Sequence, residues 1–285
     1  MRNILCVTLI ALLGGCTSTS VTEKYQDKRN DIINVKDKVI EFETGNVLIG
    51  SVSRLYMSNK CLLIADHKSV DKQIHIFNKN DFSYLTSIGN FGEGPEEITV
   101  MGCLAIDEAH HQLYVSDHAK QKIFSYDMDS VMVDSLYKPQ VKTAMNETLF
   151  PSEYQYINDT LSIAVLIKPT STSTFNQFLG RWNMNTGEMI PMKYTHPDIQ
   201  KKRITFAASE KAGIYVECYT RHDLMTICSL DGELLYNIYG PDWDGGNGNK
   251  LQSFGTVMIG NDKIFVSYCG EDYARDSFPT KILDR

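Results

Sequence analysis

The chain has 285 residues, of which 42% are hydrophobic and 22% charged, and its net charge is -7 at pH 7. This length allows one large domain with a sizeable core. A mildly acidic chain without a basic cluster is a poor nucleic-acid binder, because phosphate contacts need gathered Lys and Arg side chains. We therefore expect no nucleic-acid partner.

The first fifteen residues have the pattern of an export signal. Arg2 supplies a positive charge, residues 4–13 are almost wholly apolar, and two glycines follow. This order is typical of a secretory signal peptide, and the apolar stretch is well short of the ~20 residues that span a bilayer. We predict a signal peptide over residues 1–15.

Cys16 comes directly after this signal. A cysteine behind Leu-Gly-Gly resembles the lipobox of bacterial lipoproteins, which implies cleavage before Cys16 and a lipid on its thiol. Small polar residues and then a charge-rich run follow, so residues 16–38 are predicted to form a flexible tether. The chain is expected in the cell envelope, lipid-anchored at the periplasmic face or the outer-membrane surface. The alternative is a plain secreted protein, or a membrane anchor with a chance cysteine.

Five cysteines follow the tether, none of them in CxxC spacing: Cys61, Cys103, Cys218, Cys228 and Cys269. Each lies in an apolar or strand-like run, which predicts buried thiols. One disulfide between Cys218 and Cys228, across neighbouring strands, is the alternative.

Strand-like stretches recur at intervals of about fifty residues. Residues 62–68 resemble residues 113–120, so that Asp66 corresponds to Asp117, and residues 213–217 resemble residues 263–267. The runs are short, rich in Val, Ile, Tyr and Phe, and bounded by Asn, Asp and Gly, as strands in hairpins are.

A repeated unit of ~40 to 50 residues with four strands favours an all-β fold, a β-propeller over residues 39–285. The alternative is a β-sandwich in which the copies are similar by chance. The predicted blades lie near residues 47–97, 98–149, 150–200, 201–253 and 254–285.

The stretch GNFGEGPEE, residues 89–97, lies between two of these blades. A phosphate-binding loop needs a helix N-terminus behind its glycines, whereas Glu96 and Glu97 would repel phosphate. We predict that the loop turns a corner, since Gly89, Gly92 and Gly94 permit positive φ and Pro95 stiffens the exit.

The same stretch resembles the G-x-x-G-x-G-P-x-E pattern of TolB-like six-bladed propeller lipoproteins from Bacteroides-type bacteria. Residues 239–242 and 114–117 fit that resemblance, which covers most of residues 39–285, although the strand copies also occur in NHL-like propellers. The resemblance implies a six-bladed propeller on a lipid tether, and it does not imply a catalytic activity. Residues 278–285 read as a third strand entering a turn, so an open propeller of about five blades, truncated at its C-terminus, is expected.

Three histidines could suggest a metal site. His110, His111 and His118 lie near Asp107 and Asp117. Neighbouring residues of a strand face opposite ways, and a metal needs ligands that converge. A solvated hairpin turn is the favoured interpretation, and we assign no metal site and no cofactor.

Residues 242–248, DWDGGNG, resemble the start of a calcium loop, but the twelfth position is Ser253 where a glutamate would be needed. We predict a mobile loop on a propeller rim with an exposed Trp243. Asp242, Trp243 and Asp244 are therefore candidate contact residues.

No catalytic residues are assigned. Glu96 and Glu97 are adjacent and would seldom converge on one substrate, and the sequence has no G-x-S-x-G motif. The favoured function is a membrane-anchored binding or scaffold module that uses its rim loops, Gly89 to Glu96 among them, to hold an envelope protein or a glycan. The alternative is a metal-dependent hydrolase or lyase, which would need polar ligands from three or more blades in the central channel.

Overall fold

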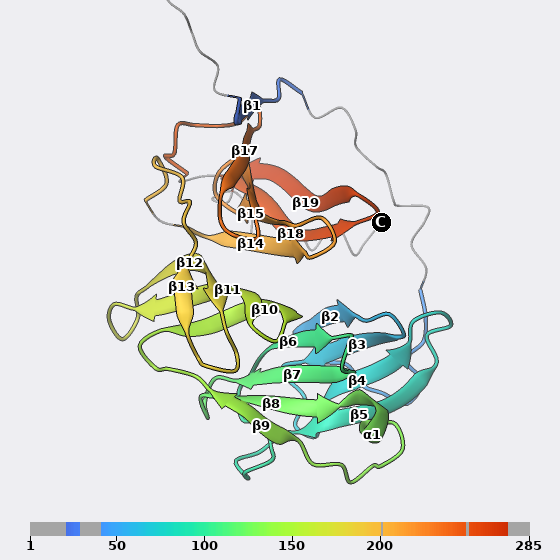
Figure 1. Cartoon of the computed structure of the whole chain (residues 1–285). Coiled ribbons are helices and arrows are strands. Elements are labelled where there is room, and N and C mark those ends of the chain that lie inside the picture. Colours follow the sequence, from blue (N-terminus) through green and yellow to red (C-terminus); the bar gives the residue numbers. More distant parts are fainter. Residues whose placement is uncertain (1–20, 29–40, 201, 249–250, 273–285) are drawn as a thin grey trace, which may run out of the picture.

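The computed structural model describes residues 21–28, 41–200, 202–248 and 251–272. Their strands form five antiparallel sheets that follow one another along the chain (Figure 1). Apart from a short strand at residues 23–25 and the first residues of a strand that starts at residue 251, each sheet falls within one of the predicted blades, which confirms the propeller. The signal peptide, Cys16 and residues 278–285 lie outside the described residues.

Three sheets have four strands each, in chain order. The first contains β2 (Ser53–Met57), β3 (Cys61–Asp66), β4 (Lys72–Asn78) and β5 (Tyr84–Asn90). The second contains β6 (Met101–Asp107), β7 (Gln112–Asp117), β8 (Lys122–Asp127) and β9 (Gln140–Ala144), with the short helix α1 (Met128–Val131) before β9. The third contains β10 (Phe150–Asn158), β11 (Leu161–Pro169), β12 (Phe175–Trp182) and β13 (Met189–Pro191).

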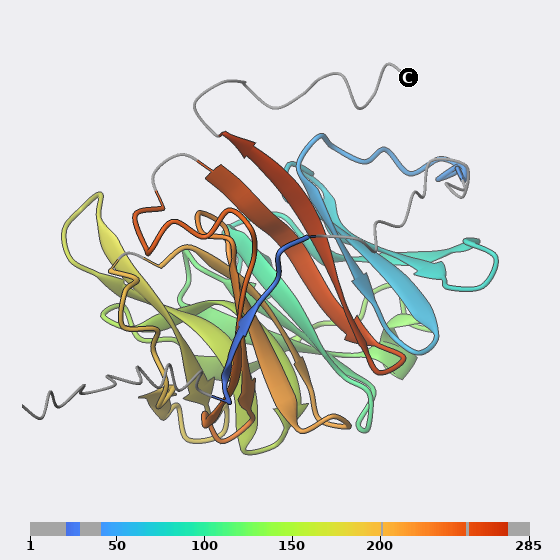
Figure 2. The same ribbon diagram turned by 90° about the horizontal axis from the view of Figure 1, so that it is seen from above.

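The fourth sheet contains β14 (Ile204–Ser209), β15 (Ile214–Tyr219), β16 (Leu224–Ser229) and β17 (Leu234–Tyr239), and the short strand β1 (Glu23–Tyr25) joins it beside β17. The described part of the fifth sheet is the hairpin of β18 (Leu251–Gly260) and β19 (Lys263–Asp272). The first strands of neighbouring sheets contact each other, β6 with β10 and β14 with β18 (Figure 2 gives the view from above).

The core is divided into clusters that lie between consecutive sheets. One cluster joins Leu63 and Ile74 of the first sheet to Val115 and Phe124 of the second, and others lie between each following pair. In a strand that is buried on both faces, successive side chains point to opposite faces, and both β3 and β7 are buried almost throughout. The sheets therefore depend on each other for burial.

The repeated aspartates, Asp66 and Asp117, have the same structural role. Each ends the second strand of its sheet and is buried. Asp66 Oδ2 accepts a hydrogen bond from the Gly50 amide at 2.7 Å, and Asp117 Oδ2 accepts one from the Thr99 amide at 2.8 Å. Both carboxylates thus fix the chain as it enters the first strand of their own sheet.

The alternation of strands creates two rims. Strand one of each sheet runs away from the loop that joins it to the preceding sheet, and strand four runs back to the next such loop. We call the side with these loops the linker rim; it carries residues 91–100 and 240–248 and the turns at residues 67–71 and 118–121. The opposite side, the hairpin rim, carries residues 58–60, 79–83, 108–111 and 128–139.

The structure differs from two statements made from the sequence, one about the tether and one about a disulfide. β1 lies within the predicted tether and pairs in parallel with β17, so part of that segment joins the fourth sheet. Cys218 lies opposite Met225 and Cys228 opposite Tyr215, and both thiols are free and buried, so the alternative of a disulfide between them is wrong. No helix in the described part of the chain is long and apolar enough to cross a membrane.

Candidate functional site

The loop of residues 89–97 turns the corner between β5 and β6, as predicted. Gly89 has a φ of 75°, and a Cβ on Gly92 would lie 2.0 Å from the Glu97 carboxylate. That carboxylate accepts a hydrogen bond from the Gly94 amide at 2.8 Å. Glu97 is therefore a structural residue of the loop.

Lys120, from the neighbouring turn of residues 118–121, stabilises the loop through hydrogen bonds to its carbonyl groups. Its Nζ donates to the carbonyls of Gly94 and Glu97, each at 2.5 Å, and to that of Gly92 at 3.4 Å. Glu96 forms an exposed ion pair with Lys138 at 2.8 Å. The polar groups of the loop are thus largely used within the protein, and the exposed Phe91 ring is its most available contact group.

The second candidate loop, residues 240–248, is also stabilised internally. The Asp244 carboxylate accepts hydrogen bonds from the amides of Gly246 and Gly248. The Asp242 amide donates to Asp223, and the Asp242 carboxylate accepts from the Tyr268 hydroxyl at 3.3 Å. Asp244 therefore stabilises a turn, and Asp242 ties the loop to β19.

The prediction that Trp243 is exposed is wrong. Its ring lies 5.0 Å from Tyr239, 5.5 Å from His196 and 6.0 Å from His222, and it packs against the core between the third and fourth sheets. Burial of a large aromatic ring among others outweighs the polar sequence around it. Trp243 therefore fixes the loop to the core by packing against it.

The two predicted loops lie on the same rim, and exposed apolar side chains gather there over the first two sheets. Val52, Val70, Phe91 and Val100 are all exposed; we call them the apolar arc. The Phe91 amide donates to Asp71, next to Val70, and the carbonyls of Val52 and Val100 accept from the amides that follow β3 and β7. These bonds join the turns that carry the arc into one surface.

Polar side chains from three sheets meet near the first strands on the linker side. Arg54 of β2 forms an ion pair with Glu153 of β10 at 2.9 Å. His67 Nδ1 donates to the Met101 carbonyl at 3.2 Å, and His118 forms the corresponding bond to the backbone of Pro151. Burial lowers the pKa of both imidazoles, although nearby carboxylates raise it, so both histidines are neutral at pH 7.

Sequence reasoning missed Arg54, His67 and Glu153. The signal for the histidines is present in the repeat, because an Asp-His pair ends the second strand in both the first and the second sheet. Each imidazole reaches the first strand of the next sheet. Arg54 and Glu153 are 99 residues apart and carry no such signal.

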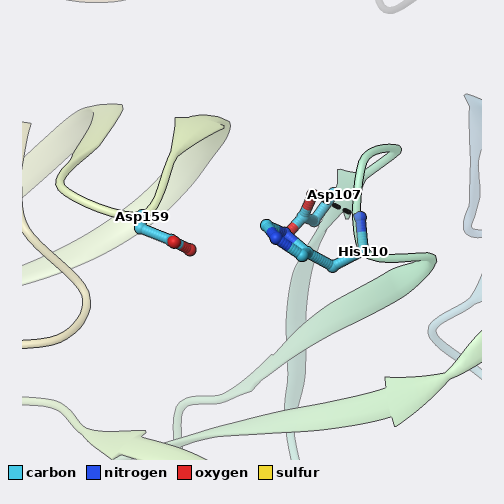
Figure 3. A group of neighbouring side chains, drawn as sticks. All are labelled: Asp107, His110 and Asp159. Atoms are coloured by element: carbon cyan, nitrogen blue, oxygen red, sulfur yellow. Dashed lines mark hydrogen bonds and ion pairs between the residues drawn. The ribbon is translucent and has the colours of Figure 1, made fainter.

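The histidines that seemed to cluster in the sequence separate in space. His118 lies at the linker rim, His111 pairs with Asp129 at 2.7 Å, and His110 binds Asp107 at 2.8 Å on the hairpin rim. Asp159, from the turn between β10 and β11, completes a group with Asp107 and His110 (Figure 3).

This group has ligand atoms that lie within 4.8 Å of one another and could hold a metal ion. The polar atoms of this group also have hydrogen-bond partners within the protein, so the group does not need a metal ion. Asp107 is buried and accepts hydrogen bonds from the amides of Ala109 and His110 as well as from the imidazole, and Tyr156 donates to Asp159 at 2.7 Å. Hydrogen bonding to Asp107 raises the pKa of His110, so that an imidazolium balances the carboxylates.

The pH dependence of stability should report this imidazolium. A raised folded-state pKa means that His110 stabilises the fold below its ordinary value of ~6.5, and that this stabilisation is lost as the pH rises through the folded-state value. We expect the melting temperature of the native chain to exceed that of His110→Gln at about pH 5 and to converge with it by about pH 9. A difference that does not change with pH would show that the imidazolium has no such role.

The search of curated proteins found no match. A structure of a Bacteroides fragilis protein that is described as exported aligns with 88% of this chain and 74% of its own, with 14% identity and a TM-score of 0.52. A DUF4221 family member from Bacteroides vulgatus aligns with 64% of this chain, with 11% identity and a TM-score of 0.48; the chain spans 56% of its length.

The first of these likenesses shows the fold alone. A family model described as a 6-bladed beta-propeller, DUF5128, matches residues 17–179, which is more than half of the chain. The match includes β1 and the first three sheets almost entirely, and thus both Asp-His pairs and the loop of residues 89–97. The chain belongs to this family of six-bladed β-propellers.

Proposed function

We propose that the chain is a lipid-anchored binding module of the cell envelope that holds a protein partner on its linker rim. The observation that carries this proposal is the apolar arc. Exposed apolar side chains that gather on one surface mark interaction sites, whereas single ones are ordinary. Phe91 is the best anchor, because a rigid aromatic ring buries a large area at little entropic cost.

The charges beside the arc suit selective recognition. Arg54 and Glu153 offer both signs next to an apolar surface, which favours a partner with a complementary pair over a simple apolar one. The half-exposed state of both side chains leaves them accessible from the rim. A protein surface fits these features better than a glycan, because the arc is aliphatic apart from Phe91.

The sequence supports the proposed lipid anchor. Cys16 behind a signal peptide supports lipidation, and the exported Bacteroides fragilis protein of the same fold supports an envelope location. The glycine-proline loop supports the closer likeness to TolB-like lipoproteins. None of these features assigns a reaction to the fold.

The direction of β1 supports an orientation on the membrane. β1 runs parallel to β17, from the hairpin rim toward the linker rim. Cys16 precedes Glu23 by seven residues, which span at most ~25 Å when extended. We therefore propose that the lipid lies on the hairpin side, so that the linker rim points away from the bilayer toward a partner.

Site-specific photo-crosslinking tests the proposal. A photoreactive phenylalanine analogue at position 91 should give discrete protein adducts in cells, and Val100→Asp should abolish them. The same analogue at position 236 is the matched control, because Tyr236 is 42% exposed against 45% for Phe91 but lies on an outer strand. Equal adducts at both positions, or none at position 91, would contradict the proposal. Cys16→Ser should move the protein out of the membrane fraction.

One observation favours the alternative of a metal-dependent hydrolase or lyase. His67, His118 and Glu153 come from three sheets, and the Nε2 atoms of both histidines are buried without a hydrogen-bond partner, although these three residues do not form a group of ligand atoms within 4.8 Å in the described part of the chain. Binding of Zn²⁺ or Mn²⁺ that is lost in His118→Ala would favour this alternative over the binding module.

A further inference from the structure

A pocket of about 360 Å³ opens on the hairpin rim between the first and second sheets. Its inner wall consists of core side chains, among them Leu63, Ile106 and Leu113. Leu85 and Met132 lie at its mouth and are exposed. Ligand pockets in proteins have volumes of ~300–1,000 Å³ and mostly apolar walls with few polar groups. The pocket meets both conditions, and neither predicted rim loop takes part in it.

The wall formed by the second sheet can adapt its shape. Met128 belongs to the one-turn helix α1, and Met132 follows it directly. Unbranched thioether side chains fill irregular space and rearrange easily. The connection continues into Val133 and Leu136, which are 87% and 82% exposed. An apolar protrusion thus stands beside an apolar pocket on the same rim.

The charges at the mouth restrict the occupant. Glu108 and Asp129 border the pocket, and Glu108 accepts one hydrogen bond, from the Asn59 amide. Asp129 is paired with His111. Lys60 is the one lysine that borders the pocket, and the buried Asp107 adds further negative charge. An anionic head group is therefore disfavoured, whereas an uncharged group or an ammonium is compatible.

The position of the tether indicates where the occupant comes from. The chain enters β1 from the hairpin side, and with the lipid of the proposed function on that side the rim that bears the pocket and the protrusion faces the bilayer; this step rests on the proposed function. We propose that the pocket holds one acyl chain of an uncharged or zwitterionic membrane lipid, with Met132, Val133 and Leu136 at the lipid surface. A flexible chain suits methionine walls, and an ammonium head group suits Glu108 and Asp129.

The test uses residues 17–285 without the lipid, so a failure of anchoring or of partner binding leaves it intact. The neutral fluorophore N-phenyl-1-naphthylamine is the probe, and it should bind with one site per chain. Monoacyl phosphatidylethanolamine below its micelle concentration should displace it, and dodecanoate should do so at least about tenfold less well, because the mouth is acidic.

Two variants locate the site. Ile106→Trp fills the pocket and Met132→Glu adds a charge to its mouth, and each should weaken probe binding at least about tenfold. Met258→Glu, at an exposed apolar position of β18 outside the pocket, should leave binding unchanged. Unchanged binding in a folded Met132→Glu chain, or equal loss in Met258→Glu, would overturn the proposal. Stronger displacement by dodecanoate would overturn the choice of lipid.

Discussion

Replacing Lys202 by methionine should lower the free energy of unfolding by about 3–5 kcal/mol. Lys202 Nζ lies 2.8 Å from Glu217 Oε1, and the two side chains are 7% and 2% exposed. The ammonium also lies 5.8 Å from the centre of the Tyr219 ring. Methionine keeps most of the volume but leaves the Glu217 carboxylate buried without its counter-ion. Urea unfolding of the native and variant chains measures the difference.

An exposed pair in the same half of the molecule provides the control. Lys193 and Glu233 lie 2.5 Å apart with side chains that are more than half exposed. Lys193→Met should cost less than about 1 kcal/mol, because water solvates the glutamate that remains. The double variant Lys202→Met, Glu217→Gln should recover much of the lost stability. If Lys202→Met cost no more than Lys193→Met, burial of the pair would not be the source of the effect.

Replacing Lys120 by methionine should cost about 2 kcal/mol and loosen the loop of residues 89–97. The variant removes the donor shared by the carbonyls of Gly92, Gly94 and Glu97, which then lack their partner inside a tight turn. Thermal unfolding measures the stability, and hydrogen exchange of the Gly94 amide measures the loosening.

Lys138→Met is the control on the same loop. It removes only the exposed ion pair with Glu96, so its effect should stay below about 1 kcal/mol. Faster exchange at Gly94 in Lys120→Met but not in Lys138→Met would show that the loop depends on the buried donor. Equal effects would show that Glu97 alone maintains the turn.

Lys202 contacts the end of a polar row that runs through β15, β16, β17 and β1 of the fourth sheet. Glu217, Thr226, Asn237 and Glu23 lie opposite one another in consecutive strand pairs. The Thr226 hydroxyl donates to Asn237 Oδ1 at 2.8 Å, and Asn237 Nδ2 donates to Glu23 Oε1 at 3.2 Å. A buried row is stable only if its members are paired. Glu23 therefore fixes β1 to the sheet.

The strands and their grouping into blades could be predicted from the sequence. Alternating Val, Ile, Tyr and Phe between Asn, Asp and Gly is a local signal, and the match of Asp66 to Asp117 gives the period. The role of residues 89–97 as a corner also followed from local chemistry, since three glycines need freedom in φ and two carboxylates exclude a phosphate. The same local reading failed for Trp243, because the rings that bury it come from three other segments.

The sequence by itself determined the class of fold and the corner between the first two blades, because each depends on neighbouring residues. Only the tertiary structure decided which side chains meet. It brought Arg54 to Glu153, His110 to Asp159, and β1 to β17, and it opened the pocket beside Met132. These contacts join residues that are tens to hundreds of positions apart. Which of these residues meet depends on how whole sheets pack against each other, and a local sequence pattern does not contain that information.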